Sequence, residues 1–269
     1  MNRNELITCA AKFTQDSPGN YIAKEIALSP DYAGMKIFEP PILAFGSADD
    51  AIYLQYKSPD VIGGHFMPPT EWLPEAKTVI SFFLPYTARI KKANAANNLW
   101  PADEWLHGRF EGQLFVRALS VHLATLLSDA GHKSLVPSLD ARFKTGDPTG
   151  KRFTSNWSER HVAFACGLGT FGLSRGIITE KGMCGRLGSV VTELDLPKDS
   201  RPYQETYAYC TMCGLCIKHC PVQAISFAEG KKHLPCSDFL DTVLAKHNPR
   251  YACGKCQVHV PCESGIPKK

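Results

Sequence analysis

The cysteines of this 269-residue chain gather at one end, and their spacing constrains the fold more than any other feature. Eight of the eleven cysteines lie after residue 209. The first four, Cys210, Cys213, Cys216 and Cys220, have gaps of two, two and three residues, and a proline follows the last. Two-residue gaps let one tight loop present three thiolates to an iron–sulfur cubane, and the fourth cysteine of this bacterial pattern binds a second cluster. The spacing therefore predicts one-electron transfer.

A second cluster needs further thiolates, and the remaining C-terminal cysteines can supply them. From the motif we expect two [4Fe-4S] clusters, one bound by Cys210, Cys213, Cys216 and Cys262 and the other by Cys220, Cys236, Cys253 and Cys256. The second half departs from the usual spacing, because five residues separate Cys256 from Cys262 and a proline precedes Cys262. Cys262 is therefore the least regular of the eight predicted ligands.

Zinc and disulfides are the alternative uses of clustered cysteines. Structural zinc sites place two Cys-x-x-Cys pairs well apart, whereas three thiols here fall within seven residues. Disulfides need an oxidising compartment, and the first residues show neither a signal peptide's apolar core nor a twin-arginine pair. We therefore expect a cytoplasmic protein. Cys9, Cys166 and Cys184 are scattered, which is typical of free buried cysteine.

Composition and charge bound the function class. A hydrophobic content of 44 % can form a core, and no apolar run approaches the length of a membrane helix, so we expect no membrane partner. The formal net charge of +4 omits the clusters. Each oxidised cluster with its four thiolates carries about −2, so two clusters bring the loaded chain to about zero. A basic surface for nucleic acid is therefore not expected.

The chain divides near residue 200. Residues 196–202 form a polar, proline-bracketed stretch with the composition of a linker. We therefore predict an α/β domain over residues 1–200 and a small two-cluster ferredoxin-like domain over residues 201–269.

Upstream of that boundary, helical and strand patterns alternate. Residues 78–84 are almost all apolar and suit a buried strand. Apolar residues at helical spacing predict an amphipathic helix over about 113–130, with Gly131 as its stop. Residues 135–136 and 188–194 are typical of further strands. This alternation predicts a layered α/β domain.

A glycine-rich run, Gly167-Leu-Gly-Thr-Phe-Gly172, matches the dinucleotide-binding pattern in letters only. That pattern requires a strand before it and a helix after it. Here Asn156 followed by Glu159 resembles a capping box, which predicts a helix over residues 157–166 that Gly167 terminates. The glycines instead predict a loop whose backbone can lie against something flat and large.

Four segments together resemble a known family. Residues 72–81, 130–138, 165–169 and 187–194 resemble the epoxyqueuosine reductases and the related reductive dehalogenases, in the same order and ahead of the same two-cluster ending. The resemblance covers roughly residues 60–262. It implies a nitroreductase-like α/β domain that holds a cobalamin, to which the clusters pass electrons.

The same resemblance assigns a cofactor-binding segment. It places Gly167, Leu168, Gly169, Thr170, Phe171 and Gly172 against the corrin ring. No Asp-x-His-x-x-Gly run offers a lower histidine ligand, which agrees with this family.

Two departures bear on the specific reaction. Epoxyqueuosine reductases carry an acidic proton donor shortly before the Gly-Leu-Gly run, whereas residues 152–156 of this chain contain no acid. The candidate proton donors are then Glu159, His161 and Tyr86. Longer members also carry a helical-repeat tail that helps to hold transfer RNA, and none follows Cys262. We therefore do not expect transfer RNA as a partner.

Three functions are consistent with these observations. The first is a cobalamin- and [4Fe-4S]-dependent reductase that acts on a small molecule and takes electrons from a small donor such as a ferredoxin or flavodoxin. The second is an electron-transfer module that reduces a partner protein and has neither cobalamin nor a substrate of its own. The third is a redox sensor, which would require different partner affinities in its two oxidation states.

Overall fold

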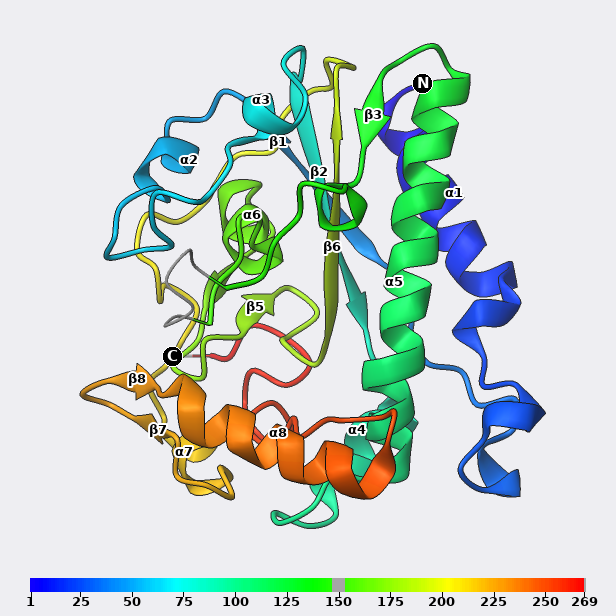
Figure 1. The fold of residues 1–269 in the computed structure, drawn as a ribbon, viewed down its shortest axis with the longest axis vertical. Helices are drawn as coiled ribbons and strands as arrows, with labels where there is room; N and C mark the ends of the chain where they lie inside the picture. The colour runs from blue at the N-terminus through cyan, green and yellow to red at the C-terminus, as the bar shows by residue number, and fades with distance from the viewer. Residues whose placement is uncertain (147–152, 269) are drawn as a thin grey trace.

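The computed structural model describes residues 1–146 and 153–268, and its centre is a four-stranded antiparallel sheet in the order β1-β2-β6-β3 (Figure 1). Its strands are β1 Ile42–Ser47, β2 Thr78–Pro85, β6 Gly185–Thr192 and β3 Ser134–Leu135. Two short hairpins pair β4 Gly169–Phe171 with β5 Ile177–Thr179, and β7 Ile225–Ser226 with β8 Gly230–Lys231. The helices are α1 Arg3–Asp16, α2 Ile52–Gln55, α3 Pro69–Trp72, α4 Ala88–Ala95, α5 Asp103–Asp129, α6 Glu159–Ala165, α7 Leu215–Lys218 and α8 His233–His247.

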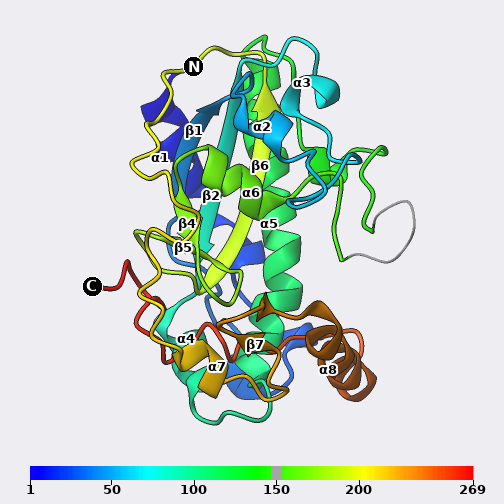
Figure 2. The same ribbon diagram turned by 90° about the vertical axis from the view of Figure 1, so that its left-hand side faces the viewer.

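Strand β2 is buried because the core packs against both of its faces. All eight of its residues are buried, as its continuous apolar sequence predicts. Ile80 and Phe82 pack into the core on the α1 and α5 side, whereas Val79 and Phe83 pack into the core on the α6 side. Figure 2 shows α6 in front of the sheet and α5 behind it. The expected layered α/β fold is confirmed.

Helix α5 is longer than its sequence pattern predicted. The expected helix over about 113–130 ends where it should, next to Gly131 with its positive φ of 86°, but it begins at Asp103. Gly108 and Gly112 interrupt the helical pattern in the sequence, so the first turns were not predicted. These glycines let the helix pack closely on two aromatic rings, since a Cβ atom would lie 3.0 Å from the Tyr86 ring at Gly108 and 2.8 Å from the Phe38 ring at Gly112.

Helix α6 confirms the helix expected over residues 157–166, but its predicted cap is wrong. The N-cap is Ser158, and no side chain caps the helix. The Asn156 side chain instead accepts a hydrogen bond from the Lys144 backbone at 2.8 Å and donates one to the Arg142 carbonyl at 2.9 Å. The expected capping role of Glu159 therefore does not exist.

The glycine-rich run after α6 is not the loop that we expected. Gly167 ends the helix with a φ of 85°, and residues 169–171 then form β4, paired with β5. A strand before the run and a helix after it, which a dinucleotide site requires, are both absent from this described segment.

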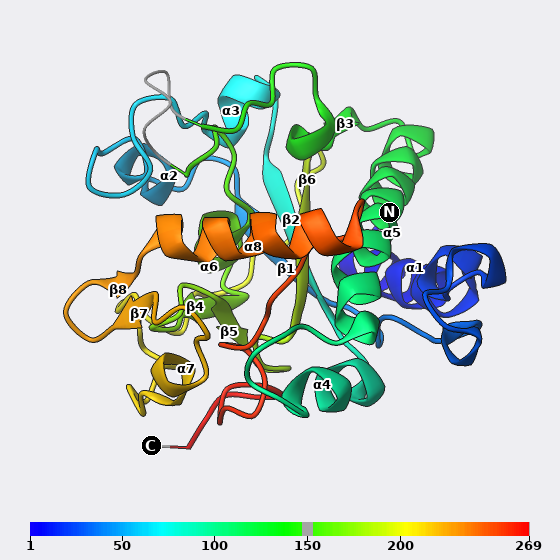
Figure 3. The same cartoon turned by 60° about the horizontal axis from the view of Figure 1, so that its bottom comes forward.

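The C-terminal part covers one end of the sheet. Figure 3 shows α8 crossing that end, with the β7–β8 hairpin at its start. Val243, Ala252 and Val258 join the core on the α5 side, and Val260 packs with Ile178 and Met183 in a third core cluster. Within the described ranges, no helix combines the length and apolar character that crossing a membrane requires.

Candidate metal centres and the adjoining polar site

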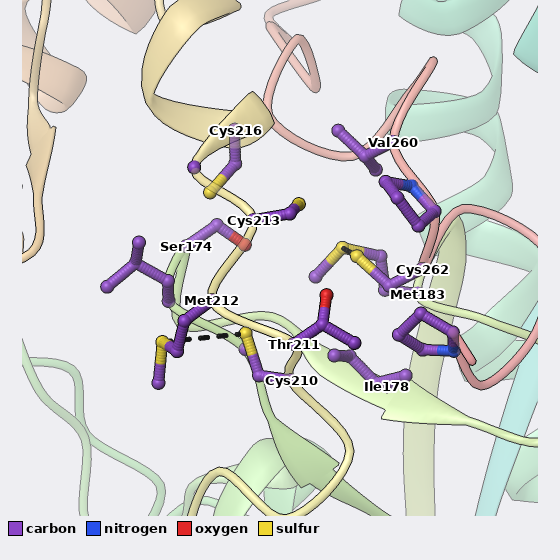
Figure 4. A pocket seen from close by; sticks show the side chains of 15 residues that line it. Ser174, Ile178, Met183, Cys210, Thr211, Met212, Cys213, Cys216, Val260 and Cys262 are labelled. Carbon is purple, nitrogen blue, oxygen red and sulfur yellow. Dashed lines mark hydrogen bonds between the residues drawn. The ribbon is translucent and has the colours of Figure 1, made fainter. Parts of the chain in front are cut away.

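One cavity collects the first predicted set of cysteines. Cys210 and Cys213 come from the loop that enters α7, where Gly214 adopts a left-handed conformation with a φ of 74°, and Cys216 lies in α7 itself. Cys262 faces them from the C-terminal segment (Figure 4). Its Sγ lies 3.4 Å from the sulfur of Met183, which the core holds in place. Folding thus brings the irregular Cys262 to the tight loop despite its distance in sequence.

A second cavity, with a volume of about 170 Å³, collects the other predicted set. Cys220 lies two residues after α7, Cys236 lies in the first turn of α8, and Cys253 and Cys256 lie in the segment after that helix. The Cys220 sulfur accepts a hydrogen bond from the Ala224 backbone at 3.2 Å. The cysteines of each cavity are the four that the motif pairs for one cluster, and their role as ligands stays a prediction.

The chemistry of the two cavities fits a cation-rich cluster. Burial, together with the charges of neighbouring cysteines, raises the pKa of Cys216, Cys253 and Cys262 to about 12. Four thiolates can therefore share either cavity only when positive charge, such as that of bound iron, compensates theirs. No group of three or more His, Cys, Asp or Glu side chains among the described residues is arranged for a single metal ion. A cubane places its irons between more widely spaced thiolates than one tetrahedral ion does.

The two cavities are neighbours. Helix α7 connects them, because it contains Cys216 of the first set and ends two residues before Cys220 of the second. After burial, the largest influence on the Cys216 pKa is the charge of Cys256, which lines the second cavity. One turn of helix rises about 5.4 Å. Clusters in these cavities would therefore lie close enough for direct electron exchange.

Glu159, one of the three predicted proton donors, has a buried and unpartnered carboxyl group. Neither of its oxygens has a hydrogen-bond partner among the described residues. Burial raises its pKa from 4.5 to about 7. The polar side-chain groups of Ser189 and Trp157 act in the opposite direction and lower the pKa. The nearby charge of Arg186 also lowers it. A carboxyl group with this pKa can hold or release a proton near neutral pH.

His161 and Tyr86 are committed to other contacts. Burial, followed by the charge of Arg160, lowers the pKa of His161 to about 4, and its ring packs against Phe171 with centroids 5.0 Å apart. The Tyr86 hydroxyl donates to the Gly108 carbonyl at 2.9 Å, and burial raises its pKa to about 12. Neither side chain combines an available proton with a pKa near neutrality.

The predicted cofactor segment, residues 167–172, packs against the chain itself. A Cβ atom at Gly167 would lie 2.8 Å from the Ser200 carbonyl oxygen, and one at Gly169 would lie 2.2 Å from the Ile178 carbonyl oxygen. The Gly169 amide donates to the Tyr203 hydroxyl at 3.1 Å. Leu168 and Thr170 are buried, and Phe171 is partly buried. The glycines therefore serve close packing between segments.

Three cations line the second cavity, namely Arg109 from α5, Arg186 from β6 and Lys231 from β8, and sequence reasoning did not place them beside the second cysteine set. They come from three distant segments, so no local spacing could have identified them. The tract at residues 152–156, where the family's acid would lie, is partly outside the described residues, because Arg152 is not described.

Comparisons with known proteins agree with this geometry. Residues 205–226 match the family described as a 4Fe-4S binding domain. No curated protein matches the chain. The epoxyqueuosine reductase from Streptococcus thermophilus has 17 % identity and a TM-score of 0.54, with 100 % of this chain and 68 % of that one covered.

Two further structures have the same fold. An epoxyqueuosine reductase in complex with an epoxyqueuosine-modified tRNA stem loop has 20 % identity and a TM-score of 0.53, with 85 % of this chain and 63 % of that one covered. A reductive dehalogenase has 14 % identity and a TM-score of 0.54, with 84 % and 30 % covered. The chain thus spans less than two thirds of several of these relatives. It has the fold of the epoxyqueuosine reductases and reductive dehalogenases, with a 4Fe-4S binding domain in its C-terminal part.

Proposed function

We propose that this protein is an iron–sulfur reductase in which two [4Fe-4S] clusters deliver electrons, one at a time, to an acceptor bound against the α/β layers. The observation that carries the proposal is the convergence of eight cysteines on two adjoining cavities, four to each. The 4Fe-4S match at residues 205–226 supports it. Electrons would enter from a small one-electron donor of the ferredoxin or flavodoxin class.

Glu159 is the residue that we propose as the proton donor. Reduction of most organic substrates consumes protons together with electrons. The Glu159 carboxyl is buried, unpartnered among the described side chains and protonated in part at neutral pH. It also lies within the electrostatic reach of Arg186, which lines the second cysteine cavity. The electrostatic interaction of Glu159 with Arg186 supports a path in which the electrons from the second cluster and the proton from Glu159 reach the same part of the protein.

A cobalamin is the acceptor that the fold suggests, because a mechanism for B12-dependent dehalogenation has been inferred from the structure of one reductive dehalogenase with this fold. When bound, cobalamin supplies a strongly nucleophilic low-valent cobalt. Two of the six residues predicted to contact it, Gly167 and Gly169, lie close to backbone carbonyls of the same chain on the side where a Cβ atom would stand, and the contact of this segment with a corrin stays a prediction. We therefore assign no step to a cobalamin.

Transfer RNA is kept as a candidate substrate class beside small molecules. We expected no such partner, but a structure with this fold binds a modified tRNA stem loop. The near-neutral charge of the loaded chain gives no independent support for polynucleotide binding.

The proposal is tested with anaerobically isolated protein. Broad absorption near 400 nm that dithionite bleaches, with about eight iron atoms per chain, is the expected result. Added corrinoid that stays bound through gel filtration would establish the cobalamin acceptor, and its loss under oxidising and reducing conditions alike would exclude it. Zinc in place of iron would contradict the whole proposal.

The alternative of a dedicated electron-transfer module is favoured by one observation, the close packing of residues 167–172. It predicts that dithionite-reduced protein reduces a partner protein and converts no small molecule or tRNA. Turnover of any such substrate by the protein alone, abolished in Glu159→Gln, would eliminate this alternative.

A further inference from the structure

The two cysteine cavities have different electrostatic surroundings. Apart from its cysteines, the first cavity is lined by glycine, proline, hydroxyl and apolar side chains, including Met183 and Met212, and no charged residue is among the described residues that line it. The second is lined by three cations, Arg109, Arg186 and Lys231, and by no acidic residue that the structure describes. The two cavities therefore differ in the net charge of the side chains that line them.

Lys231 lines the second cavity and interacts electrostatically with two of its cysteines. It lies on β8, and the charges of Cys256 and then of Cys236 act on its ammonium group. Its neighbour Lys232 follows the end of β8 and forms an exposed ion pair with Glu229 at 2.7 Å. Of these two lysines, only Lys231 lines the cavity.

The two arginines approach the cavity from the α/β layers. Arg109 donates a hydrogen bond to the Tyr251 hydroxyl at 2.8 Å and stacks over its ring at 4.6 Å. Arg186 donates to the Gln113 side chain, and its buried Nε has no partner among the described residues. No acid is among these contacts, so both charges remain available to compensate a negative cluster.

We propose that Lys231, Arg109 and Arg186 make the cluster held by Cys220, Cys236, Cys253 and Cys256 the easier of the two to reduce, so that electrons pass to it from the cluster held by Cys210, Cys213, Cys216 and Cys262. This inference rests on the proposed function, because it requires both clusters. Adding an electron adds one negative charge, which nearby cations and hydrogen bonds to sulfur stabilise. The uncharged lining of the first cavity offers no such stabilisation.

The inferred step balances as a single electron transfer. A one-electron donor of the ferredoxin or flavodoxin class reduces the first cluster from the 2+ to the 1+ state. That cluster returns to 2+ as the second goes from 2+ to 1+, and no proton or bond is exchanged. Arg186 connects the second site to Glu159 through its charge, so the electron arrives on the side where the proposed proton donor lies.

The test is an anaerobic redox titration of the holoprotein followed by electron paramagnetic resonance. We expect two separate midpoint potentials in the wild type. Lys231→Gln should make reduction of the higher-potential cluster about tenfold less favourable, a shift of about 59 mV for one electron, and should leave the lower potential in place. Lys231→Arg should restore the wild-type value, and Lys232→Gln should change neither potential.

Iron content separates the possible failures. Wild-type protein that binds fewer than about eight irons contradicts the proposed function. With both clusters present, coincident potentials, or a Lys231→Gln shift confined to the lower potential or absent, overturn the inference. If Lys231→Gln fails to load iron, Arg109→Gln provides the same test, with the same direction of shift expected and its absence overturning the proposal.

Discussion

Replacing Glu159 with glutamine should remove a penalty that burial imposes on folding at neutral pH. The carboxyl has an ordinary pKa of 4.5 and a folded-state pKa of about 7, because burial disfavours its charged form. Below pH 4.5 the group is protonated in both states and the penalty is absent. As the pH rises toward 7, the unfolded chain releases its proton while the folded chain keeps it, so the stability of the folded state falls.

The size of this effect follows from the two pKa values. Their difference corresponds to about 3 kcal/mol at about 1.36 kcal/mol per pH unit. Of this, roughly 2 kcal/mol is lost between pH 5.5 and pH 8. Glutamine does not titrate, so the stability of Glu159→Gln should lack this loss. Any fixed cost of burying the amide is the same at both pH values and cancels in the comparison.

Anaerobic urea unfolding at pH 5.5 and pH 8, with wild type and variant at equal iron content, measures the effect. Glu75→Gln is a matched control, because the exposed Glu75 pairs with Lys133, which lowers its pKa, and its contribution is lost only as the pH falls below 4.5. That control should follow the wild-type slope between the two pH values. Equal slopes for Glu159→Gln and wild type would refute the assignment of a buried, protonated carboxyl.

Two further substitutions test the packing around the site. Glu111→Ala should destabilise the protein by about 3–5 kcal/mol in urea unfolding, because it leaves the buried Arg250 guanidinium without the carboxylate that now lies 2.6 Å away; a loss below about 1 kcal/mol would contradict this. Gly169→Ala should lower stability by about 1–3 kcal/mol, since its Cβ would lie 2.2 Å from the Ile178 carbonyl oxygen. Gly64→Ala is its control, because nothing lies within 4 Å of the added Cβ and little change is expected; equal melting temperatures for the two variants would be inconsistent with the close packing of β4 on β5.

Local sequence patterns predicted those features whose cause is itself local. Strand β2 was recognisable because both of its faces are buried and its residues are apolar throughout. The end of α5 was recognisable because Gly131 supplies a positive φ. The grouping of the cysteines around two cavities was accessible because the short gaps of the loop leave Cys220 to the other set, and folding then brings Cys262 across to the first cavity; their role as ligands stays a prediction.

Other features depend on contacts between distant segments and could not be inferred locally. The glycines at 167 and 169 suggested an open cofactor surface, but they relieve contacts with Ser200 and Ile178. The Asn156 side chain matched a capping pattern, yet backbone groups at residues 142 and 144 bind it instead. The cations of the second cavity likewise come together only after α5, β6 and β8 have assembled.

The most direct test of the account is to count iron and sulfide in anaerobically prepared wild type and in two single variants, Cys262→Ser and Cys236→Ser. We predict about eight irons in the wild type and about four in each variant, with a different cluster signal retained in each, because the two cysteines line different cavities. Bound zinc, absence of iron, or loss of the same signal from both variants would contradict the assignment of two clusters to two sets of four cysteines.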